Sequence, residues 1–243
     1  MTLLRNKKFL SLYLASTVSN LGDGVASVAY PWLASAVTRN PLLVALVLVA
    51  QRLPWLVITD RVDRRKAMVL MDAARCVLTV GVGLAVLSQH GSLPAPGRIP
   101  DVLGTRAVLY TVLLVATLLL GMAEVLRDNA SVTIIPAIVD AESLEKANGR
   151  MWSTEGVMNT FLGPPLGALL IGVAFAIPFF VDAGSFFAAA ALVALIPGSF
   201  RARTADTEPA GDSSWRTELR EGIRWLWAHE LLRPMAIILG LMN

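Results

Sequence analysis

Residues 107–126 read AVLYTVLLVATLLLGMAEVL, and this stretch decides the fold because it contains a single charged residue, Glu124. A helix that crosses a bilayer needs about 20 mostly apolar residues, which is the length of this run. The whole chain has the same bias: of its 243 residues 55% are hydrophobic and 16% are charged, and its mean hydropathy is +0.62. Globular proteins in water carry about 25% charged residues. We therefore expect an all-α membrane protein.

Six further apolar runs predict the rest of the architecture. Five are long enough to cross a bilayer, at residues 9–37, 41–59, 67–88, 157–176 and 179–196. The sixth, at 234–243, would rise only ~15 Å as a helix against a hydrocarbon core of ~30 Å, so it predicts the start of a seventh span. The expected organisation is a six-helix bundle over 1–197, a linker over 198–232 and the beginning of a seventh helix over 233–243.

The N-terminal run begins like a signal peptide, with Arg5, Lys7 and Lys8, but its apolar character continues through Trp32, past the length of such a signal. It therefore predicts a span. Positive residues in short loops stay on the cytoplasmic side. Sixteen lysines and arginines fall in the connections on the N-terminal side, and the other side has three: Arg39, Arg98 and Arg106. The N-terminus is thus predicted to be cytoplasmic, in a bacterial-type inner (plasma) membrane.

The linker contains a second kind of helix. Two sets of residues recur there at helical spacing: Trp215, Leu219, Ile223 and Leu226 on one face, and Arg216, Arg220 and Arg224 on the other. Such an amphipathic pattern predicts a helix on the cytoplasmic membrane face, with membrane lipid as its partner. Elsewhere the basic residues are scattered between apolar runs, so we expect no nucleic-acid partner.

Charged residues inside a span mark functional candidates, because each costs about 2.5–3.5 kcal/mol on insertion. Asp23 lies in the first span between Gly22 and Gly24, which allow close helix approach. Arg52 lies at a similar depth in the second span, within reach of Asp23. The two residues predict either a proton or substrate site, in which Asp23 changes protonation, or a static ion pair that fixes helix packing.

Three other groups of charges lie in or near the spans. Asp72 and Arg75 are three residues apart on one helix face, which predicts a static ion pair. Asp182 falls near the outer surface of the sixth span, where we expect it to be hydrated. The third group is predicted at the cytoplasmic end of span four, at the depth of the 60–66 loop; it comprises Glu124, Arg127 and Asp128.

Span five contains Gly163-Pro164-Pro165-Leu166-Gly167, which predicts a hinge or a tight helix crossing, since proline removes backbone donors and glycine admits a neighbouring helix. Few residues point to catalysis. Cys76 is the single cysteine, and the two histidines are far apart. The sequence has no nucleophile beside a histidine base, no metal-ligand spacing and no phosphate-binding glycine loop, so we expect no enzyme, metal or cofactor.

Several of these segments resemble one transporter superfamily. Asp60-Arg61-Val62-Asp63-Arg64-Arg65 is similar to the signature loop of the major facilitator superfamily, and Gly163-Pro164 with Gly167 is similar to its antiporter motif. Three further segments resemble the drug, macrolide and siderophore exporters of that superfamily: Arg52-Leu53-Pro54-Trp55, Pro136-Ala137-Ile138-Val139 and Ala147-Asn148-Gly149.

The resemblance implies a fold of two six-helix halves that rock about a central substrate site, of which this chain contains the N-terminal half and the start of the seventh helix. It also implies a cytoplasmic gating loop formed by Asp60, Arg61, Arg64 and Arg65. In such a gate Asp60 bonds across the interface between the halves and toward the basic end of span four, where Arg127 is its local partner.

The function implied is secondary active efflux of small amphipathic organic compounds by proton-coupled antiport, with Asp23 and Arg52 on the substrate and proton pathway. The alternative is a truncated or degenerate half that inserts into the membrane without transporting, or that acts as an interaction partner. Two assemblies stay open at this point: a second half that completes the transporter, and a homodimer of two half-chains.

Overall fold

The computed structural model of the chain describes residues 3–52, 63–89, 93, 105–198, 200, 215–229 and 231–242. It divides into two compact units, Met1–Ala202 and Arg203–Asn243. In the described part of both units the regular secondary structure is helical, which confirms the all-α prediction.

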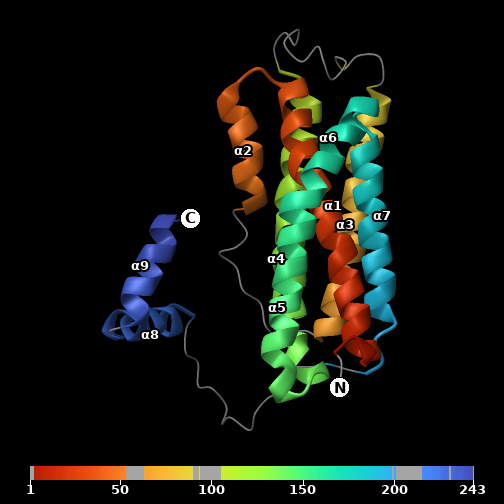
Figure 1. The fold of residues 1–243 in the computed structure, drawn as a ribbon. Helices are drawn as coiled ribbons and strands as arrows, with labels where there is room; N and C mark the ends of the chain where they lie inside the picture. The colour runs from red at the N-terminus through yellow and green to blue at the C-terminus, as the bar shows by residue number, and fades with distance from the viewer. Residues whose placement is uncertain are drawn as a thin grey trace. The chain divides into compact units, whose positions relative to one another are not determined.

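The first unit is a helical bundle (Figure 1). Its helices are α1 (Lys7–Val37), α2 (Pro41–Arg52), α3 (Arg64–Ser88), α4 (Ala107–Ile138), α5 (Leu144–Glu155), α6 (Gly163–Val173) and α7 (Ile177–Ala194). A π-helical segment, η5 (Gly156–Leu162), joins α5 to α6, and the short 3-10 turns η1 (Leu3–Arg5) and η4 (Ala141–Ser143) precede α1 and α5. Each predicted span in this unit overlaps one of these helices, and the fifth overlaps η5 and α6; residues 53–59 of the second predicted span lie outside the described residues.

Two helices begin at side-chain caps that also join elements distant in sequence. The Asn6 side chain accepts from the backbone N–H groups of Lys8 and Phe9 at 3.0 and 3.3 Å, and its amide donates to the carbonyl of Ile138 at 2.7 Å. The Asp63 carboxylate caps α3 by accepting from the backbone N–H of Lys66 and also accepts from that of Phe200, each at 3.2 Å. The first cap therefore joins the start of α1 to the end of α4, and the second joins the start of α3 to the segment that follows α7.

Four helices of the described chain are long and apolar enough to cross a membrane: Arg64–Ser88, Ala107–Ile138, Ala141–Val173 and Ile177–Ala194. Helix α2 is a shorter apolar helix within its described residues. Helix α1 is 31 residues long but less apolar, because it lies against α7, α6, η5 and α4 and is rich in Ala, Ser and Gly. Small residues of this kind let membrane helices approach closely.

The interior of the bundle contains two apolar cores with a polar layer between them. One core lies around the N-terminal end and includes Leu12 of α1 and Ala130 of α4. The second core begins at Ala26 of α1 and extends to Leu120 of α4. Between these limits α1 presents Ser16, Ser19 and Asp23, and α4 presents Arg127, so the buried charges are enclosed by apolar packing on both sides.

Helix α4 extends twelve residues beyond the predicted end of span four. Arg127 consequently lies eleven residues, ~16 Å, inside the helix. The prediction that Arg127 lies at the cytoplasmic end, level with the 60–66 loop, is wrong. The part of α4 that lies level with this loop is Thr133, because Arg64 of the loop donates a hydrogen bond to the Thr133 carbonyl. Hydropathy ends the span at residue 126 because it scores the next residues as polar, although Arg127 faces the bundle interior.

The second unit contains α8 (Trp215–Ala228) and α9 (Leu232–Met242), which occupy the positions of the predicted amphipathic helix and of the predicted start of span seven. Near the end of α8 the rings of Trp225 and His229 lie 5.3 Å apart, and Trp225 and Trp227 are exposed. The membrane contact of α8 stays a prediction.

Candidate functional site

Four charged side chains from three helices form the centre of the polar layer. Asp23 of α1 pairs with Arg75 of α3, whose guanidinium also lies 3.8 Å from the Asp72 carboxylate. Arg127 of α4 lies 3.4 Å from the same Asp72 oxygen. We call Asp23, Asp72, Arg75 and Arg127 the charged cluster. It links α1, α3 and α4 through alternating acids and bases.

Further side chains orient the two arginines. Arg75 donates to Ser19 Oγ at 3.4 Å, and its guanidinium carbon lies 3.9 Å from the centre of the Phe186 ring on α7. That geometry is a cation–π contact. Arg127 is only 2% exposed and donates to Ser16 Oγ at 3.2 Å. Among the described residues no group of three His, Cys, Asp or Glu side chains is placed to hold a metal.

A third carboxylate, that of Asp182 on α7, lies beside the charged cluster. It is 1% exposed, and a Cβ atom on Gly22 of α1 would lie 2.5 Å from it. The charge of Asp182 interacts with those of Asp23 and Arg75. The prediction that Asp182 is hydrated near the surface is wrong, because the glycine lets α1 approach α7 and exclude water from the carboxylate.

The predicted ion pairs are found in part. The Asp72–Arg75 pair is confirmed. Asp23 is paired as well, but its described partner is Arg75 on the third span rather than Arg52 on the second. The side chain of Arg52 lies outside the described residues, so its place on a substrate or proton pathway stays a prediction.

The gating loop is described from residue 63 onward, and Asp60 and Arg61 lie outside the described residues. Arg64 donates to the Thr133 carbonyl of α4 at 2.8 Å, and Arg65 donates to the Ala194 carbonyl of α7 at 2.7 Å. Ala194 is the last residue of α7, and cationic donors commonly satisfy the free carbonyls at such a helix C-terminus. The two arginines therefore hold the start of α3 against α4 and α7.

The Gly-Pro-Pro motif lies where α1 crosses the η5–α6 segment, as the predicted tight crossing requires. A Cβ atom on Gly24 would lie 2.8 Å from the Gly163 Cα atom, and one on Gly167 would lie 2.6 Å from the Val25 carbonyl oxygen. Real Cβ atoms do not come so close to backbone. The two helices therefore touch backbone to backbone, directly beside Asp23.

Proline accounts for the π-helical segment before α6. Pro164 and Pro165 have no N–H, so the carbonyls of Thr160 and Phe161 lose their α-helical donors. The N–H of Gly163 instead donates to the carbonyl of Met158, five residues earlier. Figure 1 shows the helix changing direction where α6 begins. A π-helical turn inside a longer helix is frequent at functional sites.

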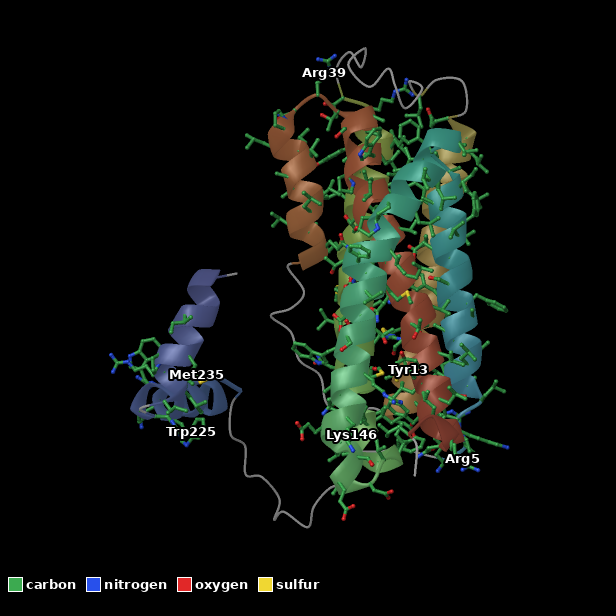
Figure 2. The ribbon with its side chains drawn as sticks, in the orientation of Figure 1. Arg5, Tyr13, Arg39, Lys146, Trp225 and Met235 are labelled. Atoms are coloured by element: carbon green, nitrogen blue, oxygen red, sulfur yellow. The ribbon has the colours of Figure 1, made fainter. Side chains whose placement is uncertain are left out.

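A cavity of about 330 Å³ opens beside Arg127, between α1, α4 and α5. Its polar lining includes Asn20 of α1, Asp128 of α4 and Glu155 of α5, and its apolar lining includes Trp152. Tyr13, labelled in Figure 2, bonds to Thr154 at 2.7 Å and fixes α5 against α1 next to this cavity. The sequence reasoning did not single out Glu155 or Trp152, since both precede the apolar run that predicts span five.

A bundle of membrane-length helices with ion pairs between two apolar cores has the architecture of an α-helical membrane protein. Residues 1–235 match the family described as transmembrane secretion effector. Since this match covers almost the whole chain, the protein belongs to that family of the major facilitator superfamily.

Two curated relatives are similar along the chain. Multidrug efflux pump Tap from Mycolicibacterium fortuitum is 25% identical over 255 residues, which cover 98% of this chain and 56% of the relative. The uncharacterized MFS-type transporter YfiS from Bacillus subtilis is 28% identical over 241 residues, covering 95% and 52%. The chain thus spans about half the length of these relatives. No solved structure matches it.

Proposed function

We propose that the protein takes part in secondary active efflux of small amphipathic organic compounds, driven by entry of protons. The family supports a transporter, and the similarity to a multidrug efflux pump supports export. The observation that carries the proposal is the Asp23–Arg75 ion pair between two apolar cores. A buried ion pair whose acid can take up a proton is a device for coupling proton entry to a change of shape.

The charge balance of the interior favours uptake of a proton. Three carboxylates, those of Asp23, Asp72 and Asp182, share the polar layer with the guanidinium groups of Arg75 and Arg127. Glu124 and Asp128 of α4 also interact with this group, so its carboxylates outnumber its guanidinium groups. Uptake of a proton reduces this excess of negative charge without bringing any other ion into the bilayer.

Protonation of Asp23 would weaken its hold on Arg75, which keeps an ion pair with Asp72 at 3.8 Å and also interacts with the charges of Glu124 and Asp182. The attachment of α1 to α3 would thereby be weakened to the hydrogen bond between Ser19 and Arg75, while the backbone contact of α1 with α6 at Gly24 and Gly163 is unchanged. Under the proposal this change in the contacts of α1 is the local step of alternating access between two halves, with Arg52 as a further residue of the pathway.

The proposed location is the plasma membrane, with the N-terminus in the cytoplasm. Figure 2 shows Arg5 and Lys146 at one end of the bundle and Arg39 at the other, and among the described residues of the bundle the lysines and arginines outside the polar layer are more numerous at the end with Arg5. By the positive-inside rule that end faces the cytoplasm. Asp60 and Arg61, together with Arg64 and Arg65, would then gate the cytoplasmic entrance.

The test is transport in everted membrane vesicles that contain the protein expressed at the full length of its gene. We expect uptake of ethidium on acidification of the vesicle lumen, and loss of this uptake when a protonophore is added. Asp23→Asn should lower uptake at least tenfold and remove its dependence on the pH gradient. Asp140→Asn, an exposed aspartate at the end of α4, is the matched control.

Uptake by Asp23→Asn at the normal rate and with normal pH dependence would overturn the assigned proton role. Correctly inserted protein with no flux of any substrate would overturn the efflux proposal itself and favour a membrane-inserted half that does not transport. Membrane insertion is checked in the same vesicles by alkaline carbonate extraction, so that loss of flux is not mistaken for loss of protein.

A further inference from the structure

The cavity between α1, α4 and α5 has an uneven distribution of charge. Arg127 is its one cationic lining residue among those described, and the carboxylates of Asp128 and Glu155 also line it. Arg127 already forms ion pairs with two acids, because it lies 3.4 Å from Asp72 and 3.2 Å from Asp128. Glu155 is therefore the lining carboxylate left to interact with a ligand.

Glu155 forms no ion pair with any other described residue, although its charge interacts with those of Asp128 and Arg127. It is exposed and stands at the end of α5, where the helix passes into η5. The bond between Tyr13 and Thr154 holds this part of α5 against α1. The stretch of helix that carries this carboxylate is thus fixed beside the cavity, while the carboxylate itself has no ion-pair partner among the described residues.

An aromatic side chain lies one helical turn before this carboxylate. Trp152 lines the same cavity and is 75% exposed, so its indole is accessible to a ligand. Residues three apart on a helix lie on one face, so the indole and the carboxylate of Glu155 border the same space. Val132 and Ile135 of α4 add apolar wall opposite them.

We propose that this cavity selects organic cations that carry an apolar body, with Glu155 and Trp152 as specificity-determining residues. A carboxylate attracts the cationic centre, and an indole face binds it by cation–π attraction. The apolar wall favours a lipophilic ion over a hydrated metal ion or polyamine. A volume of about 330 Å³ is within the range of small-molecule sites. The inference rests on the proposed function and names the substrate class of that transporter.

The experiment compares two ions of the same shape and opposite charge, tetraphenylphosphonium and tetraphenylborate. Binding of each radiolabelled ion is measured by equilibrium dialysis to the full-length protein in phosphatidylcholine discs, with binding to empty discs subtracted. We expect saturable binding of the phosphonium and none of the borate. Glu155→Gln should weaken phosphonium binding about tenfold, and Trp152→Leu about fivefold.

Two variants serve as controls. Glu155→Asp keeps the charge and should bind within about twofold of the unchanged protein. Glu145→Gln removes an exposed carboxylate from the same helix, outside the cavity lining, and should bind normally. Equal affinity for both ions, or phosphonium binding that is unaffected by Glu155→Gln, would overturn the inference.

Failure of this inference can be separated from failure of the proposed function. Proton-driven efflux that shows no preference for the cation, or does not depend on Glu155, would reject the substrate class and leave the transporter in place. Phosphonium binding that depends on Glu155 in a protein that shows no proton-driven flux would support the binding site and reject the efflux.

Discussion

Helix α1 contacts its neighbours by different physical means on its two sides, and the change occurs between adjacent residues. Through Asp23 it reaches Arg75 on α3 by a buried ion pair. Through Gly24 it meets Gly163 on the η5–α6 segment by direct backbone contact. The first contact depends on charge, and the second depends on the absence of side chains.

The difference matters because only one of the two contacts responds to a proton. An ion pair loses most of its attraction when the acid is neutralised, whereas van der Waals contact between backbones does not change with pH. Helix α1 is therefore joined to α3 by a reversible contact and to α6 by a permanent one. The predictions below test this contrast, beginning with the charged side.

Replacement of Arg75 by Met should have the largest effect. It leaves the buried carboxylate of Asp72 and the partly buried carboxylate of Asp23 without this cation, and breaking a buried ion pair in this way costs about 3–5 kcal/mol. We expect a loss of that size in the free energy of unfolding, measured by denaturant titration in detergent micelles. Arg39→Met, at an exposed arginine that lies at one end of the bundle away from the charged cluster, should leave stability unchanged.

The double variant Arg75→Met with Asp23→Asn sharpens this test, because it removes one of the uncompensated charges together with the cation. It should be more stable than the sum of the two single losses predicts, as coupled residues are in a double-mutant cycle. Strict additivity would show that Asp23 and Arg75 do not depend on one another.

On the backbone side, Gly163→Val should cost about 1–3 kcal/mol by overpacking the crossing with α1. The effect should be the same at every pH at which the protein is folded. Gly172→Val on the same helix provides the control, because a Cβ atom there meets nothing within 4 Å. The stability of both variants is measured by thermal unfolding followed by tryptophan fluorescence. Equal losses of stability at the two positions would show that the crossing has no special role.

The smallest effect is expected from Tyr13→Phe, which removes the bond to Thr154 between α1 and α5. One hydrogen bond of this kind contributes about 1 kcal/mol. Thr154→Val should cost a similar amount, and the double variant no more than either single one. A loss of several kcal/mol in the same unfolding assay would mean that α5 is attached to α1 mainly through this pair.

Most of the fold could be predicted from the sequence because membrane spans are local features. An apolar run of sufficient length fixes a helix without reference to the rest of the chain. The exceptions have a common cause. Helix α4 continues beyond residue 126, and Asp182 is buried, because their polar residues face other helices rather than lipid. Which way a side chain faces depends on neighbours that a hydropathy window does not contain.

The candidate site was predicted less completely for the same reason. The Asp72–Arg75 pair was predictable, since three residues along one helix fix its geometry. Asp23 was recognised as a site, but depth alone suggested Arg52 as its partner, and the choice of Arg75 depends on which helices are adjacent. To predict Glu155 as a site residue, one must also know that α5 continues through η5 into α6, and no apolar run indicates this.

The Asp23–Arg75 pair also has a consequence for the order of events during synthesis. The arginine follows the aspartate by 52 residues in the chain. At about 5–20 residues per second the ribosome needs about 3–10 seconds to make that length. Helix α1 therefore leaves the ribosome before its counter-ion exists, and its apolar residues alone must offset the about 2.5–3.5 kcal/mol that an acid costs on insertion. The ion pair is a late product of assembly, made only when the third helix arrives.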